Sequence, residues 1–511
     1  MTAPTRGKLA AVRAHARANT ATHTNTSASA HATRMKSPNN QGSSPQKIPA
    51  KVFCAVIAAG LLSLSGVVVE TAMNITFPTL MREFSISTDT VQWMTTIYLL
   101  IVSIIVPLSA SFKARFPTKK LFITANLLFI AGLIIDLTAP VFPMLLLGRA
   151  VQGLGTGIAL PLMFNIILEQ VPPAKIGMMM GFGTLITAVA PAIGPTFGGV
   201  VVSTMSWRYI FAFLLPVLVI SLVMGIISIE QKSKLRKVPF DFLSIALIAV
   251  TFCGIVLGFS SMASNTFFSL RVGGAMLIGC IALVAFAMRQ MRLKSPILDL
   301  RLFGNLNFSG YVIAFFLFQL SALGLSFVLP NYIQLVDGSS ALQAGLLLLP
   351  GAAIGALLAP LSGRLLDALG PKPPLLSGPL IAIIALALFT LLNGHLGNAG
   401  ICIIYVIYML GTGITMGNTM TTGLSQLSGE QKSDGNAIFT TIQQFAAAVG
   451  TSVAATLVAV GQNATTDQAQ GTSDGSHLAF VALLIALIIQ YAATAKVTAF
   501  PFRTRSGSKE R

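Results

Sequence analysis

The chain has 511 residues, of which 54% are hydrophobic and only 9% are charged, and its formal net charge is +18. This composition excludes a soluble globular protein and places the chain in a membrane. The positive charge does not indicate nucleic-acid binding, because the basic residues cluster in the tails and in alternate loops between apolar runs. The four cysteines stand singly and the five histidines lie in the tail or in loops, so no metal or cofactor is expected.

Residues 1–50 are rich in Ser, Thr, Ala and Asn and contain no acidic residue, which predicts a disordered basic tail. The segment resembles a transit peptide in being acid-free, but Pro, Asn and Gln break any amphipathic helix after Met35. The alternative is that translation starts at Met35 and that the first 34 residues are an upstream extension.

Apolar runs of about 20 residues, long enough to cross a bilayer, fill the rest of the chain. They predict fourteen transmembrane helices, at 52–78, 91–111, 120–139, 143–168, 176–202, 207–229, 241–260, 270–290, 307–330, 342–367, 373–393, 399–424, 435–460 and 477–496. We therefore expect an all-helical integral membrane protein.

The charges between the spans predict its orientation. One set of connections is basic and contains Lys113, Arg115, Lys119, Lys120, Lys232, Lys234, Arg236, Lys237, Arg289, Arg292, Lys294 and Arg301. The opposite set offers only Arg82, Arg208 and Arg271. An even number of spans then places both termini in the cytoplasm, and the polar segment 461–476 becomes a short outer loop with little surface for a large partner.

Two parts of the chain resemble each other, because similar short turns, Ala110–Lys120 and Gly363–Lys372, follow spans 2 and 10. Parallel repeats of this kind are typical of transporters that rock around a site at the midplane. The expected organisation is a tail at 1–50, a six-helix bundle at 52–229, two inserted helices at 241–290, a second six-helix bundle at 307–496 and a basic tail at 497–511.

Two ionisable residues lie deep in their spans. Glu70 is roughly 12 Å from Pro78 at the outer end of span 1, and Arg149 is roughly 9 Å from Pro143 at the outer start of span 4. Charges at such depth are costly, so they face a protein-lined cavity or pair with one another. The similar depths allow a switchable pairing of Glu70 with Arg149. The alternative is a permanent salt bridge that only fixes helix packing.

Two further polar residues accompany this pair. Asp136, about 4.5 Å from the outer end of span 3 by helical rise, is either a second proton-carrying group or an interfacial residue. Gln152 lies one turn from Arg149 on the same helix face. It either binds substrate, orients the arginine or joins two helices by a polar contact.

Small residues recur in span 5, where they allow close helix approach, and a proline allows a bend. Ordinary membrane packing also explains such residues. Their order resembles the antiporter motif of the major facilitator superfamily, although Ala190 stands where that motif has glycine. The matching positions are Gly181, Ala190, Gly194, Pro195, Gly198 and Gly199.

Other segments resemble the 14-span drug:proton antiporters of that superfamily, the QacA/EmrB-like family. They are Glu70–Pro78, Arg149–Gly153, Trp207–Phe211, Pro296–Phe303 and Leu329–Gln334. The resemblance runs from about residue 52 to 496. It implies the major facilitator fold and the export of amphipathic, above all cationic, drugs or toxic compounds from the cell in exchange for protons. Glu70 would then take a proton from outside and release it when a cationic substrate enters.

One motif departs from the family pattern. The loop between spans 2 and 3 has Ala114 where the family has the aspartate of a gating ion pair, although Arg115 remains. The corresponding loop of the second half, after span 10, keeps the family pattern, so a cytoplasmic gate is expected to use Asp367. The alternative is that Arg364 and Asp367 only form a solvated helix end, which explains them equally well. The expected gate residues are Arg115, Gly363, Arg364, Asp367 and Gly370.

No GxxxxGK[ST] sequence or large soluble domain accompanies the spans, so we do not expect an ATPase or another enzyme. The expected partners are a small-molecule substrate, protons and the lipid bilayer, and a periplasmic adaptor stays open. Two alternatives also stay open: a proton-coupled exporter of a specific metabolite, such as an amino acid, and a membrane sensor or interaction protein that transports nothing.

Overall fold

The computed structural model describes residues 48–172, 175–231, 235, 241–262, 269–293, 296–428 and 431–499. The predictions for the N-terminal tail, for most of the C-terminal tail and for several basic loop residues lie outside these ranges. The loop residues concerned are Lys232, Lys234, Arg236, Lys237 and Lys294.

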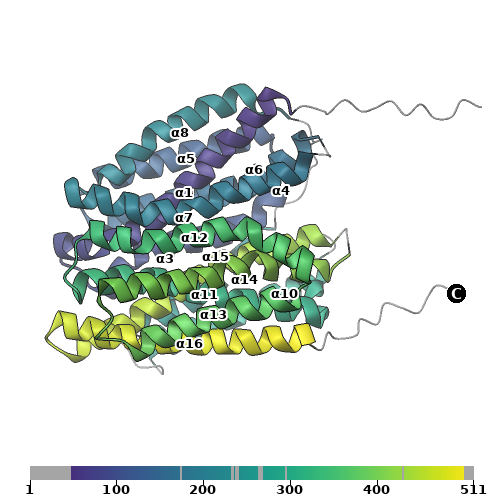
Figure 1. The fold of residues 1–511 in the computed structure, drawn as a ribbon. Helices are drawn as coiled ribbons and strands as arrows, with labels where there is room; N and C mark the ends of the chain where they lie inside the picture. Colours follow the sequence, from purple (N-terminus) through teal and green to yellow (C-terminus); the bar gives the residue numbers. More distant parts are fainter. Residues whose placement is uncertain are drawn as a thin grey trace, which may run out of the picture. The chain divides into compact units, whose positions relative to one another are not determined.

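The described chain is built from α-helices joined by short turns (Figure 1). The N-terminal helices are α1 (Ala50–Phe84), α2 (Thr88–Val91), α3 (Trp93–Ile105), α4 (Ser109–Arg115), α5 (Thr118–Thr138), α6 (Phe142–Gln170), α7 (Ile176–Thr204) and α8 (Tyr209–Ser228). A pair follows, α9 (Phe242–Ser261) and α10 (Ala275–Arg292). The C-terminal helices are α11 (Leu306–Leu335), α12 (Ala341–Leu369), α13 (Lys372–Leu391), α14 (Gly397–Ser425), α15 (Lys432–Ala464) and α16 (Gln468–Ala499).

Each predicted span overlaps a helix. Among the described residues, 13 helices are long and apolar enough to cross a membrane, while α7 contributes a shorter apolar stretch, Val189–Thr204. The second predicted span is interrupted by a 3₁₀ turn at Val106–Leu108. Pro107 explains this turn, because proline has no N–H to continue the helical hydrogen bonds. The all-helical membrane fold is therefore confirmed.

The predicted outer loop at 461–476 was wrong. α15 continues to Ala464 and α16 begins at Gln468, so only three residues, Thr465–Asp467, connect them. Glycines allow this, because a Cβ on Gly461 would collide with the Gly475 backbone nitrogen. The backbones of α15 and α16 are in contact at their connected ends, outside the apolar parts of the two helices. The polar sequence at these ends is therefore helical.

The small residues of α7 bring it into backbone contact with two helices. A Cβ on Gly198 would lie 2.6 Å from the Ala72 carbonyl oxygen of α1, and one on Gly345 of α12 would lie 2.5 Å from the Pro195 carbonyl oxygen. Gly194 and Gly199 make similarly close approaches to α1 and α12. We call these contacts the glycine seam. The surroundings of Gly181 lie outside the described part of the chain.

Polar side chains join other helices at the end of the molecule where α1 ends. Gln92 at the start of α3 donates to Ser260 of α9 at 3.0 Å, and the Thr88 hydroxyl donates to Gln462 of α15 at 2.6 Å. Further bonds there are Thr96 with Ser452, Asn74 to Ser326, and Gln334 to the Ile75 carbonyl oxygen. We call this set the polar seam.

An ion pair fastens the ends of α1, α5 and α8 at this same end. Glu83 accepts a hydrogen bond from the Trp207 indole at 2.6 Å and from Arg208 at 2.8 Å. Arg208 also donates to the carbonyl oxygen of Ala139, just after α5. The Trp207–Phe211 segment thus caps the end of the helix that carries Asp136.

We expect Gly198→Val to destabilise the protein by about 2 kcal/mol, because a side chain there must push α1 away from α7. Gly363→Val is the matched control, since a Cβ on that helical glycine meets nothing within 4 Å. Chemical denaturation of the two purified variants in detergent measures the difference. Equal losses for both variants would contradict the glycine seam.

Candidate functional site

Arg149 is fully buried on α6 and its side chain reaches α3. Its Nε donates to the Met94 carbonyl oxygen at 3.1 Å, and its guanidinium lies 4.2 Å from the centre of the Tyr98 ring. A guanidinium over an aromatic face is attracted to the negative face of that ring. The Tyr98 hydroxyl in turn donates to Thr156, which follows Arg149 along α6.

Gln152 connects Arg149 to a carboxylate. Its Oε1 accepts a hydrogen bond from Arg149 Nη1 at 2.5 Å, and its Nε2 donates to Asp136 Oδ2 at 2.7 Å. Asp136 on α5 is therefore buried between helices: its exposed fraction is 0%. Helical rise predicts the depth of Asp136 but not the side of the helix on which it lies, and that side faces α6.

Two glycines make room for this chain of contacts. A Cβ on Gly148 would collide with the Asp136 carboxylate, and a Cβ on Gly132 would lie 2.6 Å from the Gln152 side chain. α5 and α6 therefore pack close enough for the aspartate to reach the glutamine. Arg149 Nη2 and Asp136 Oδ1 are buried atoms without a hydrogen-bond partner in the described part of the chain.

Glu70 lies apart from this cluster. It keeps 9% exposure on α1, and within the described part of the chain no hydrogen bond or ion pair involves it. Arg149 acts on it electrostatically, but the two groups are not in contact. This conformation therefore contradicts a permanent Glu70–Arg149 salt bridge.

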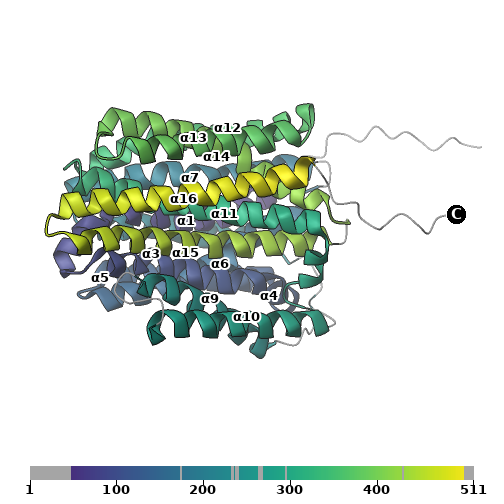
Figure 2. The ribbon, with the colours of Figure 1, turned by 90° about the horizontal axis from the view of Figure 1, so that it is seen from below.

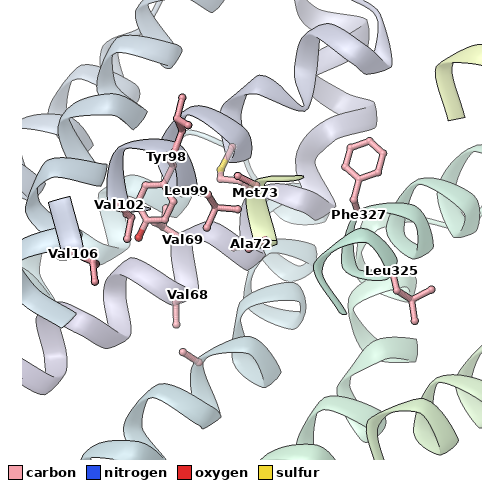
Figure 3. Packing of buried hydrophobic residues seen from close by; sticks show 14 of the residues in the cluster. Val68, Val69, Ala72, Met73, Tyr98, Leu99, Val102, Val106, Leu325 and Phe327 are labelled. Atoms are coloured by element: carbon pink, nitrogen blue, oxygen red, sulfur yellow. The ribbon is translucent and has the colours of Figure 1, made fainter. Parts of the chain in front are cut away.

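Apolar packing holds α1 against α3 around Glu70. Figure 3 shows Val69, Ala72 and Met73 of α1 near Tyr98 and Leu99 of α3. One turn before Glu70, a Cβ on Gly66 would lie 3.0 Å from the Tyr98 hydroxyl. α1 thus approaches the helix whose tyrosine lies under Arg149, and the Glu70 backbone is held near the cluster.

Sequence reasoning missed the partners that α3 supplies. Tyr98 is one aromatic residue in an apolar run, and the Met94 contact uses a backbone carbonyl that no sequence pattern reveals. A signal did exist for Asn74, a polar residue one turn after Glu70. It accepts from Thr95 at 2.9 Å and donates to Ser326 of α11 at 3.4 Å.

The predicted gate residues do not form a cluster. Arg115, Arg364 and Asp367 are exposed, and no ion pair between them is recorded among the described residues. Gly370 ends α12 with φ +74°, a conformation that favours glycine. At this end of the molecule Lys113 instead pairs with Glu169 at 2.8 Å, joining α4 to α6.

The model of one protein family, the Major Facilitator Superfamily, matches residues 59–451. The chain belongs to this superfamily. Membership makes it a multi-pass membrane protein that transports small molecules rather than an enzyme. The cluster of α3, α5 and α6 therefore lies within the membrane domain of a transporter.

Curated relatives match most of the chain. The Lincomycin resistance protein of Listeria innocua is 38% identical over 86% of this chain and 93% of its own length. The Lincomycin resistance protein of Bacillus subtilis is 38% identical over 81% and 87%. The Multidrug resistance protein B homolog of Mycobacterium tuberculosis is 27% identical over 82% and 78%.

Solved transporter structures share the fold at low sequence identity. A bacterial homolog of the human lysosomal transporter Spinster, in an inward-facing conformation, has a TM-score of 0.62 and 15% identity, with 88% of this chain and 97% of that chain covered. A D-xylose-proton symporter has a TM-score of 0.61 and 16% identity, with 86% and 97% covered.

We expect Gln152→Leu to destabilise the protein by about 3 kcal/mol, because it leaves Arg149 and Asp136 each without a buried charged hydrogen bond. Gln170→Leu in the same helix is the control. It removes one bond to the Glu230 carbonyl oxygen, which is worth about 1 kcal/mol. Denaturation in detergent compares the two variants, and a cost for Gln152→Leu no larger than the control's would contradict the bridging role.

Proposed function

We propose that this protein exports amphipathic, above all cationic, drugs in exchange for protons, as a 14-span drug:proton antiporter of the cell membrane with both termini in the cytoplasm. The observation that carries the proposal is the unpaired, almost fully buried carboxyl group of Glu70 on α1, apart from Arg149, whose guanidinium donates to Met94 and Gln152. The names of the relatives support drugs as substrates and put lincomycin first among the compounds to test.

The proposed exchange uses Glu70 as the shared site for proton and cation. A carboxyl group in an apolar setting is favoured in its protonated form, whereas a nearby positive charge favours the carboxylate. A cationic substrate beside Glu70 therefore displaces its proton. Arg149 Nη2, which is buried and has no partner in the described chain, is the donor available to the carboxylate once the substrate has left.

Asp136 and Gln152 have a different part in the proposal. Asp136 supplies the negative charge that balances Arg149. Gln152 bridges the two side chains with two hydrogen bonds, one accepted from Arg149 and one donated to Asp136. Because this balance does not involve Glu70, the protonation of Glu70 can change without leaving Arg149 unneutralised. We therefore assign proton coupling to Glu70 and positioning to Asp136 and Gln152.

Glu70→Gln is expected to abolish proton-coupled transport while the protein stays folded, because the amide cannot exchange a proton. Purified protein in liposomes, with an imposed pH gradient, measures uptake of lincomycin and ethidium together with proton movement. Substrate-dependent proton release should fall to the level of empty liposomes. Glu70→Asp should keep part of the activity.

Glu230→Gln is the matched control for this test, because Glu230 is an exposed carboxylate that pairs with Lys51 at the surface. It should transport like the unmodified protein. Proton-coupled transport that persists in Glu70→Gln would exclude Glu70 as the coupling group. Failure of every drug, together with proton-coupled movement of an amino acid, would favour the metabolite exporter instead.

Alternating access predicts that the polar seam must open in each cycle. In a cysteine-free background, a Thr88→Cys/Gln462→Cys protein joined by a short thiol cross-linker should lose transport and regain it on reduction. A Lys51→Cys/Glu230→Cys protein is the control, since Lys51 of α1 and Glu230 just after α8 both lie in the N-terminal half and touch through their side chains. Full transport by the cross-linked Thr88→Cys/Gln462→Cys protein would exclude opening at this seam.

A further inference from the structure

α9 and α10 lie at the edge of the helix set (Figure 2). α10 is the most exposed of the described candidate spans. Leu277, Ile281 and Val284 are each about 60% exposed, which in a membrane protein means contact with lipid. The outer surface of this pair therefore belongs to the bilayer, and no other helix in the described part of the chain covers it.

Two shallow, open hollows adjoin on this surface. The first, of about 320 Å³, is lined by apolar or weakly polar side chains of α10 from Cys280 to Met288. The second, of about 450 Å³, shares Ala285 and Met288 with the first and adds Leu243 and Leu247 of α9. We call the two together the α10 groove.

The α10 groove ends at two arginines, Arg289 and Arg292. By helical rise, the distance from Cys280 to Arg292 is roughly 18 Å. One leaflet of the hydrocarbon core is about 15 Å thick, half of the bilayer value. The groove thus has an apolar part as long as one leaflet and a cationic end at the depth of the lipid headgroups.

The positive charge at this end is not fully balanced. Arg289 is bound by Asp241, with Nη2 to Oδ1 at 2.7 Å, and this hydrogen bonding holds the pKa of the Asp241 carboxyl at about 2. Arg292 is exposed and has no hydrogen bond or ion pair in the described part of the chain. Asp241 can satisfy one arginine, which leaves the charge of Arg292 for a ligand.

We propose that the α10 groove binds an anionic phospholipid, with an acyl chain along the apolar wall and the phosphate on Arg292. Guanidinium groups match phosphate oxygens with paired hydrogen bonds, and basic pockets at this depth bind anionic headgroups. The open side of Arg289, which is 36% exposed, supplies a second donor. The site is separate from Glu70 and does not depend on the proposed transport cycle.

Lipid-quenching fluorescence tests the site in the full chain. Cys280 lines the groove and is exposed, so a fluorophore on it reports which lipid lies there once Cys54, Cys253 and Cys402 are replaced by serine. The protein is placed in phosphatidylcholine liposomes with a fixed share of brominated phosphatidylglycerol or brominated phosphatidylcholine. We expect a roughly fivefold preference for the anionic lipid, the ratio that one arginine near the surface supplies.

Arg292→Gln should remove this preference, while Arg271→Gln should keep it. Arg271 is the matched control because it is an exposed arginine just before the opposite end of α10. Equal quenching by both lipids in the parent protein would overturn the proposal, as would a preference that survives Arg292→Gln. Efficient Cys280–Cys280 cross-linking with no quenching by either lipid would also overturn it, because a second copy would then occupy the groove.

Discussion

The buried guanidinium of Arg149 sets the arrangement of the helices around it. A charge in the membrane interior has no water to bind, so protein groups must supply both its hydrogen bonds and its counter-charge. Met94 of α3 supplies a carbonyl oxygen and Tyr98 of the same helix supplies a ring face. Gln152 links Arg149 through hydrogen bonds to the carboxylate of Asp136 on α5. One side chain thus fixes the approach of three helices.

This arrangement explains why Glu70 stands alone. If Asp136 balances Arg149, as we propose, a second carboxylate in contact with Arg149 would leave an excess negative charge in an apolar region, unless it carried a proton. Glu70 instead keeps a small exposed fraction on α1, at a distance from the cluster. A carboxyl group held in this way suits the proposed exchange of a proton for a cation, because no hydrogen bond or ion pair in the described part of the chain uses its charge.

The sequence predicted the spans well, because a run of about twenty apolar residues has few other stable structures. It also singled out Glu70, Arg149 and Gln152, since polar residues are rare at such depth. It left the setting of Asp136 open, because helical rise gives depth but not direction, and because the cover that Arg208 and Trp207 place over the end of α5 is a contact between distant segments. Contacts between distant helices, such as Arg149 with Tyr98, depend on packing that a single sequence does not encode visibly.

The free energy needed to separate the helices differs between the glycine seam and the polar seam. Parting the glycine seam loses close backbone packing that lipid or water does not restore. Parting the polar seam exchanges side-chain hydrogen bonds for bonds to the water that enters the opened cavity, which costs little net free energy. α9 belongs to the polar seam through Ser260, while Gln290 of α10 accepts from the Ile297 backbone ahead of α11. If α9 and α10 move with α11, opening must break the Gln92–Ser260 bond, and the pair contributes to the gate.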